Sequence, residues 1–81
     1  MNEIYTTQTC PWCHRAKLLL DRHGIDYSEI DVTTDRERQI EMIKRSERQT
    51  VPQIFLHGEH IGGYDDLVEH LKGQQQGEAA A

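Results

Sequence analysis

The sequence predicts an α/β domain in which a four-stranded mixed sheet, in the strand order 2-1-3-4, carries helices on both faces. Short β-branched or aromatic runs alternate with stretches of helical period in the order βαβαββα. The middle helix is long enough for the crossover that parallel strands require. The chain has only two cysteines, Cys10 and Cys13, and both lie between the first strand and the first helix.

The composition is that of one soluble domain. The chain has 81 residues, of which 28% are charged and 36% hydrophobic, and a chain of this size buries about 60% of the surface that its unfolded form exposes. We expect a domain over residues 1–72 and a low-complexity, frayed tail over residues 73–81. The net charge of −5 argues against a nucleic-acid partner. No apolar run approaches the ~20 residues of a membrane helix, and no signal-peptide pattern is present, so we expect a cytoplasmic protein. We also expect it to be a monomer.

The first strand and the first helix enclose the cysteines. Residues 3–7 are β-branched and aromatic and predict a strand. The helix begins at Pro11, whose missing N–H costs nothing at the first helical position, and ends at about His23, before Gly24. Residues 26–32 alternate loosely and predict the second strand. The apolar stripe of the helix, which we expect to face the core, comprises Trp12, Ala16, Leu19, Leu20 and His23.

A second helix follows the second strand. Thr34 and Glu37 have the spacing of a capping box, which predicts a helix that runs to about Ser46. Ile40 and Ile43 are expected on its buried face.

The last third of the chain predicts a hairpin and a helix. Residues 53–57 form an apolar strand, and a turn leads to a short return strand over residues 60–62. Asp65 or Asp66 then caps a last helix that ends near Lys72.

Cys10 lies at the mouth of the first helix. The unpaired N–H groups there and the helix dipole favour a thiolate, which is the reactive form of cysteine. Cys13, one turn further along, can resolve a bond formed at Cys10. Residues 10–14 also match the haem-attachment motif C-x-x-C-H, which ends at His14. A zinc site is a further alternative, in which His57 and His60 would join the two cysteines as ligands at an unusual spacing. A CxxC inside a βαβ unit is instead the thioredoxin-like signal, so we expect a redox site with no metal and no tightly bound cofactor.

Three separated motifs carry a family resemblance. They are Cys10-Pro11-Trp12-Cys13, Thr50-Val51-Pro52 and Gly62-Gly63-Tyr64-Asp65-Asp66. In this order and spacing, which cover residues 3 to about 72, they closely resemble the glutaredoxins. The resemblance implies a thioredoxin fold, reduction of protein disulfides and of protein–glutathione mixed disulfides, and glutathione as the reducing cosubstrate. The partners that it implies are glutathione and disulfide or glutathionylated proteins, with ribonucleotide reductase among the candidates.

The resemblance also implies a glutathione site. A cis Val51-Pro52 peptide bond would turn the backbone of Val51 outward beside Cys10, where it could pair with the peptide of glutathione. The N–H groups of Tyr64 and Asp65 would bind the γ-glutamyl carboxylate at the start of a helix, with an Asp side chain near the ammonium. Gln39 would reach the glycine carboxylate. The implied binding residues are Trp12, Gln39, Thr50, Val51, Pro52, Gly63, Tyr64, Asp65 and Asp66.

The sequence departs from the family pattern at three positions. Thr7 stands where many relatives have Lys, Trp12 replaces the usual Tyr, and Tyr64 stands where relatives more often have Cys or Ser. Two alternative functions also stay open. Some glutaredoxins bridge an iron–sulfur cluster between two subunits through the first cysteine and glutathione, although a proline such as Pro11 disfavours this. Other glutaredoxin-like proteins are reduced by thioredoxin reductase, and the missing Lys at Thr7 keeps that alternative open.

Overall fold

Four short strands form one sheet in the order β2-β1-β3-β4. The structure is a computed structural model that describes the backbone of residues 1–80 and the side chains of residues 1–73. β1 pairs in parallel with β2 and antiparallel with β3, and β3 pairs antiparallel with β4. The predicted mixed sheet and its strand order are confirmed. The strands are β1 (Glu3–Thr6), β2 (Ser28–Asp31), β3 (Gln53–Leu56) and β4 (Glu59–Gly62).

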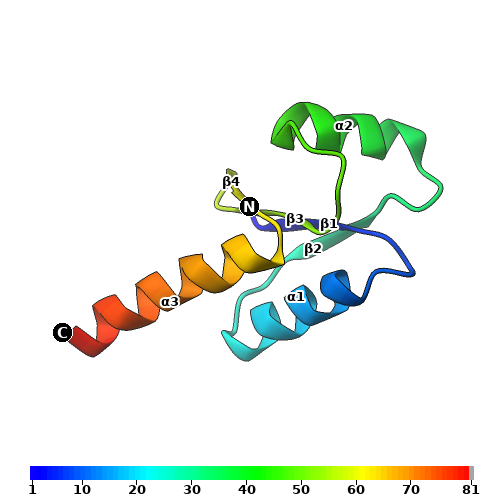
Figure 1. Cartoon of the computed structure of the whole chain (residues 1–81). Helices are drawn as coiled ribbons and strands as arrows, with labels where there is room; N and C mark the ends of the chain where they lie inside the picture. The colour runs from blue at the N-terminus through cyan, green and yellow to red at the C-terminus, as the bar shows by residue number, and fades with distance from the viewer. Residues whose placement is uncertain (81) are drawn as a thin grey trace.

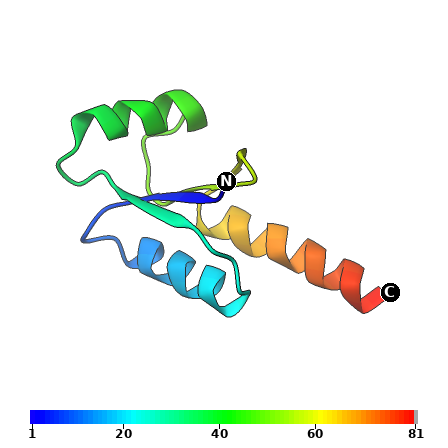
Figure 2. The ribbon, with the colours of Figure 1, turned by 180° about the vertical axis from the view of Figure 1, so that it is seen from behind.

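Three helices cover both faces of this sheet (Figures 1 and 2). α1 (Pro11–Arg22) and α3 (Tyr64–Ala80) lie side by side on one face, and α2 (Arg36–Ser46) lies on the other. Because α1 begins beyond the end of β1, and α3 beyond the end of β4, the starts of both helices meet at one end of the sheet. None of the helices, over the residues described, is long and apolar enough to cross a lipid bilayer.

The two faces of the sheet carry separate cores, because successive strand residues point to opposite sides. In β1, Ile4 faces α1 and α3 and Tyr5 faces α2. The core beneath α1 and α3 comprises Ile4, Ala16, Leu20, Ile54, Leu56, Leu67 and Leu71. The core beneath α2 comprises Tyr5, Val32, Met42 and Phe55.

The predicted apolar stripe of α1 is wrong at its first member. Ala16 and Leu20 are buried, as expected, but Trp12 is 49% exposed. The position facing the core in the first turn is occupied by Cys13, which stands three residues before Ala16 and is buried. Because Cys13, and not Trp12, faces the core in this turn, the indole of Trp12 lies outside the core, beside the start of the helix.

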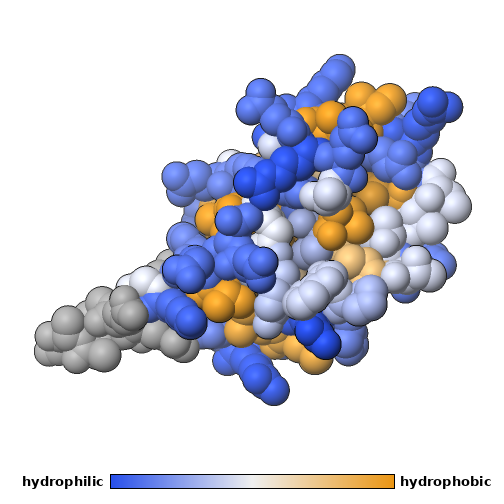
Figure 3. Space-filling view, viewed as in Figure 1, coloured by the Kyte–Doolittle hydropathy of each residue, from blue (hydrophilic) through white to orange (hydrophobic). Residues whose placement is uncertain are grey.

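The predicted buried face of α2 is also wrong. Ile40 and Ile43 are 46% and 36% exposed, and Figure 3 shows apolar atoms among the charged ones over this helix. Met42 and Ser46, which share a helix face, are the residues buried against the sheet. The hydroxyl of Ser46 is tolerated there because it donates to the carbonyl of Met42 at 2.7 Å. The cap is Asp35, whose carboxylate accepts the N–H of Arg38, rather than Thr34.

One arginine fastens α2 to the sheet. Arg45 forms an ion pair with Glu3 at 3.0 Å and donates to the hydroxyl of Tyr5 at 2.7 Å. Its guanidinium also lies 4.0 Å from the ring centre of Phe55. The hydroxyl of Tyr5 in turn donates to Glu41. These contacts fix the end of α2 from which the chain continues into the segment before β3.

The last helix differs from its prediction at both ends. α3 begins at Tyr64, so that Asp65 and Asp66 lie inside its first turn and do not precede it. It continues past Lys72, the predicted end, to Ala80, because the Gln and Ala residues of this stretch are good helix formers. The expectation of a frayed tail over 73–81 concerns residues that lie mostly outside those with described side chains, and it stays a prediction.

Candidate active site

Cys10 is the N-cap of α1, as the sequence predicts. Its backbone is extended, with φ −106° and ψ 105°, and Pro11 occupies the first helical position. The Cys10 Sγ accepts the backbone N–H of Cys13 at 3.0 Å. A sulfur in this position receives an N–H that the helix itself cannot satisfy, and it lies at the positive end of the helix dipole. Both features stabilise negative charge on this atom.

Cys13 has the opposite environment. Its side chain is only 1% exposed, because it packs inward from the first turn of α1. Burial, together with a hydrogen bond to the neighbouring Cys10, raises the pKa of the Cys13 thiol to about 12. Both cysteines are free thiols. The pair thus consists of a partly accessible sulfur that caps a helix and a buried sulfur that holds its proton.

This asymmetry predicts a dependence of stability on pH. A thiol whose pKa is raised in the folded state stabilises that state fully below its unfolded pKa, near 9, and the contribution is lost as the pH rises toward 12. The urea unfolding free energy under reducing conditions should therefore fall more steeply above pH 9 in the wild type than in Cys13→Ala. Cys10→Ser, which leaves Cys13 buried, should keep most of the wild-type slope. Parallel curves for wild type and Cys13→Ala would contradict the assignment.

The segment before β3 passes beside the accessible cysteine. The Val51-Pro52 peptide bond is cis, as the family resemblance implies. The Cys10 Sγ lies 3.8 Å from the carbonyl oxygen of Val51. A backbone carbonyl from a segment more than forty residues distant in sequence is therefore part of the immediate surroundings of the sulfur.

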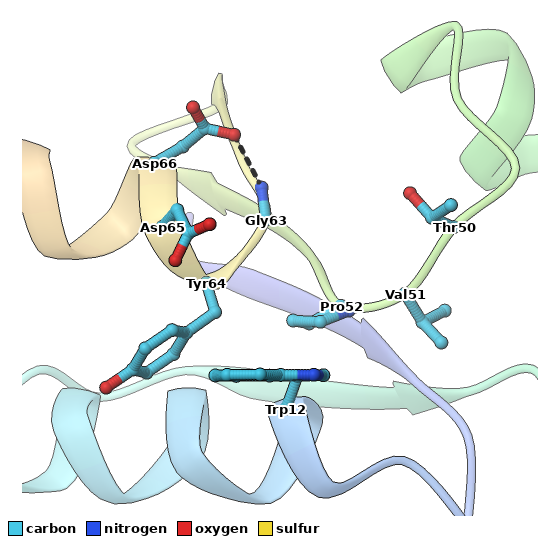
Figure 4. A pocket seen from close by; sticks show the side chains of 8 residues that line it. All are labelled: Trp12, Thr50, Val51, Pro52, Gly63, Tyr64, Asp65 and Asp66. Atoms are coloured by element: carbon cyan, nitrogen blue, oxygen red, sulfur yellow. Dashed lines mark hydrogen bonds between the residues drawn. The ribbon is translucent and has the colours of Figure 1, made fainter.

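A groove of about 220 Å³ opens between the start of α1, the segment before β3 and the start of α3. Figure 4 shows the indole of Trp12 lying flat beneath Pro52, with Tyr64 next to it and Thr50 and Val51 on the opposite side from Asp65 and Asp66. All but one of the predicted binding residues meet here. The lining comprises Trp12, Thr50, Val51, Pro52, Gly63, Tyr64, Asp65 and Asp66.

Aromatic rings form one wall of the groove. The ring centres of Trp12 and Tyr64 are 5.4 Å apart, and the guanidinium of Arg15 lies 4.7 Å from the centre of the indole. Arg15 therefore covers part of the indole and places a positive charge near the mouth of α1. The side chain of Tyr64, for which the sequence suggests only a backbone role, also contributes to the wall.

The start of α3 closes the other end of the groove. Asp66 reaches back so that its Oδ2 accepts the N–H of Gly63 at 3.0 Å, which is half of a capping box. The same oxygen pairs with Arg48 at 3.1 Å. These two contacts lower the pKa of Asp66, the Gly63 N–H being the larger cause. The N–H groups of Tyr64 and Asp65 belong to the first turn, where a helix offers unsatisfied donors to an anion.

Gln39 is the one predicted binding residue that lies outside the groove. Its Nε2 donates to the carbonyl of Val32 at 2.7 Å. It lines a neighbouring hollow, which also includes Thr7 and touches the groove only through Val51. Gln39 and Trp12 thus line two different hollows that share Val51.

Sequence reasoning missed two residues behind the groove, Gln53 and His60. Gln53 is completely buried at the start of β3, where its amide contacts Thr50 and the ring of His60. The sequence predicts only that His60 begins the return strand after the turn. A polar residue at the head of an otherwise apolar strand was the available signal, since a buried amide requires partners. Among the residues with described side chains, no group of three or more His, Cys, Asp or Glu is arranged to hold a metal ion.

These features define a class of protein. A helix-capping sulfur paired with a buried thiol in a CxxC motif, next to a cis-proline and on a four-stranded mixed sheet, is the arrangement of a thioredoxin-fold thiol–disulfide oxidoreductase. The sequence profile of the glutaredoxin family matches residues 2–61. The chain belongs to the glutaredoxin family.

Individual relatives agree with this membership. The chain is 55% identical to glutaredoxin 3 of Escherichia coli K12 over 65 residues, which cover 80% of this chain and 78% of the relative. The solution structure of glutaredoxin from Brucella melitensis has a TM-score of 0.78 at 43% identity and covers 95% of this chain and 84% of its own. A buckwheat glutaredoxin–glutathione complex has a TM-score of 0.78 at 30% identity, covering 89% and 69% of the two chains.

Proposed function

We propose that this protein uses glutathione to reduce protein–glutathione mixed disulfides and protein disulfides. The observation that carries the proposal is the position of Cys10, whose sulfur caps α1 and contacts Val51 at the edge of the groove. A tripeptide in that groove would present its own sulfur to the cysteine. We further propose that the protein works in the cytoplasm.

The reduction of a protein–glutathione mixed disulfide requires only Cys10. Its thiolate attacks the glutathionyl sulfur of a mixed disulfide, the old S–S bond breaks, and the substrate protein leaves as a thiolate that takes a proton from water. A second glutathione thiolate then attacks the glutathionyl sulfur of the Cys10 adduct and leaves as oxidised glutathione. The N–H of Cys13 and the start of α1 stabilise the departing Cys10 thiolate.

Protein disulfides would also need Cys13. Once Cys10 has formed a mixed disulfide with the substrate, the Cys13 sulfur attacks Cys10, releases the substrate thiolate and closes the internal disulfide. Two glutathione molecules then restore the two thiols and form oxidised glutathione. Because Cys13 is buried and protonated, its attack requires loss of that proton first.

The groove suits the chemical groups of glutathione. Its γ-glutamyl carboxylate would accept the N–H groups of Tyr64 and Asp65 at the start of α3. Asp66 is already paired with Arg48, so we assign the ammonium to the exposed Asp65. The peptide of the ligand would pair with the backbone of Val51 as an additional strand. A relative of this fold has been solved as a glutathione complex, which supports the assignment.

Trp12 provides a direct test of this site, because it is the only tryptophan and lines the groove. Titration with S-methylglutathione, which cannot exchange disulfides, should change its fluorescence in a saturable way. S-methylcysteinylglycine lacks the γ-glutamyl group and should bind much more weakly. Equal responses to the two ligands, or no saturation, would refute the glutathione site. A visible absorption band after anaerobic reconstitution with iron and sulfide would favour the cluster-binding alternative.

A further inference from the structure

A chain of hydrogen bonds runs from the back of the sheet to the groove. The Nε2 of Gln53 donates to the carbonyl oxygen of Thr50 at 3.0 Å and contacts its Oγ1 at 3.2 Å. The Oε1 of Gln53 lies 2.8 Å from the Nε2 of His60. Gln53 is 0% exposed, whereas Thr50 lines the groove. A buried amide in β3 is therefore connected to the surface that would receive the ligand.

The groups that Gln53 contacts determine which atom donates in each hydrogen bond of this network. A backbone carbonyl can only accept, so the amide nitrogen of Gln53 faces Thr50 and its oxygen faces His60. His60 must then carry a hydrogen on Nε2 and donate it. Burial, followed by the nearby Arg48 guanidinium, lowers the pKa of His60, and the imidazole packs against Phe55 with ring centres 5.0 Å apart and the ring planes tilted by 40°. His60 thus holds the Gln53 amide in one orientation.

That orientation determines where the next N–H points. The Thr50–Val51 peptide bond is trans, since Val51-Pro52 is the only cis bond among the described residues. In a planar trans peptide the C=O and the N–H point in opposite directions. The Thr50 carbonyl is directed toward the interior by Gln53, so the N–H of Val51 is directed away from it, toward solvent at the groove.

We propose that Gln53, supported by His60, is a positioning residue for glutathione binding that orients the Thr50–Val51 peptide so that Val51 can pair with the ligand. The inference rests on the proposed function, because it assumes that glutathione binds along Val51. Neither Gln53 nor His60 lines the groove that would receive the ligand. Their effect should therefore appear in binding and not in the intrinsic reactivity of Cys10.

The first test replaces Gln53 with Met, which keeps the length of the side chain and removes its hydrogen bonds. Gln53→Met should weaken the binding of S-methylglutathione, measured by Trp12 fluorescence, about tenfold, the equivalent of roughly 1.4 kcal/mol. The reaction of Cys10 with 4,4′-dithiodipyridine, a disulfide with no peptide group, should stay at the wild-type rate. For a glutathionylated peptide, KM should rise while kcat changes little.

The matched control is Tyr5→Phe. Tyr5 is the register partner of Gln53 across the sheet, is equally buried, and its hydroxyl bonds to Glu41 and Arg45 and not to Thr50. The control should lose stability in urea yet bind S-methylglutathione as the wild type does. If Tyr5→Phe weakens binding as much as Gln53→Met, the effect is general destabilisation and the inference is overturned.

A second variant changes His60, the residue of the network farthest from the groove. His60→Leu leaves the contact of Gln53 with Thr50 in place, so it should weaken binding less than Gln53→Met and add nothing further in the double variant. Additive losses would overturn the role of His60, and wild-type binding by Gln53→Met would overturn the inference as a whole. If the wild type itself shows no saturable binding of S-methylglutathione, the proposed function fails instead.

Discussion

Cys10→Ser should abolish the reduction of a glutathionylated peptide, whereas Cys13→Ser should retain it at a rate close to that of the wild type. Replacing a nucleophile that forms the covalent intermediate lowers a rate by a factor on the order of 10³–10⁶. In the proposed mechanism Cys13 takes no part in the exchange between glutathione and the Cys10 adduct, so its loss should matter only for protein disulfides. The measurement is a glutathione-coupled assay with both substrate types.

The two serine variants control for each other, since both replace sulfur by oxygen at the start of α1, Cys10 at the N-cap and Cys13 in the first turn. Cys13→Ser places a hydroxyl in a buried position, so it should be the less stable of the two and yet the more active. That inverse order of stability and activity separates a chemical role from a folding defect. Substantial activity in Cys10→Ser, or loss of deglutathionylation in Cys13→Ser, would reverse the assigned roles.

Gly62→Ala should destabilise the protein and weaken the binding of ligand at the start of α3. Gly62 has φ +122°, which side chains rarely adopt, and an added Cβ would lie 2.3 Å from the Oδ2 of Asp66. The strained backbone costs roughly 1–3 kcal/mol. The displaced carboxylate would also give up the N–H of Gly63, so the anion site that we propose at the N–H groups of Tyr64 and Asp65 would lose its support. We expect a lower unfolding free energy in urea together with weaker binding of S-methylglutathione.

Gly58→Ala is the matched control for this substitution. Gly58 also has a positive φ, +79°, in the β3–β4 turn, but an added Cβ there would meet nothing within 4 Å. It should lose stability from backbone strain alone and bind ligand normally. The difference between the two variants in ligand binding therefore reports the contact with Asp66. Equal binding by Gly58→Ala and Gly62→Ala would show that this contact does not support the site.

The parts of the fold that follow from local rules were predictable. Proline at the first position of α1, glycine after its end, the β-branched and aromatic residues of β1 and the apolar run of β3 each leave a local signal, and together they predict the element order. The position of Cys10 at a helix start follows from Pro11 alone. Element type and topology were therefore accessible without knowledge of the packing.

The wrong predictions concern side chains whose environment depends on another segment. Ile40 and Ile43 are apolar, but the face of α2 that meets the sheet is fixed by Met42 and by the link from Arg45 to Tyr5. Periodicity alone could not identify which of two adjacent faces would be buried. The apolar periodicity favours the face that carries Ile40 and Ile43, but the face packed on the sheet is the one that carries Met42 and Ser46.

The groove shows the same limit. Its members come from α1, from the segment before β3 and from α3, so their proximity depends on the assembled sheet. Eight of the nine residues that the family resemblance implies line the groove, and Gln39 lines the neighbouring hollow; that these residues bind glutathione stays a prediction. Gln53 and His60 were missed because no motif includes them. Only the requirement that a buried amide be satisfied connects them to Thr50.

Two cysteine sulfurs in different environments lie beside one groove: Cys10 is partly accessible, and Cys13 is buried. Limited modification of the reduced protein with iodoacetamide near neutral pH, followed by peptide mapping in a mass spectrometer, measures this directly. The label should fall on Cys10, leave Cys13 unmodified, and be suppressed when S-methylglutathione saturates the groove. Labelling of Cys13 at a comparable rate, or of Cys10 at an unchanged rate with the ligand present, would contradict the account.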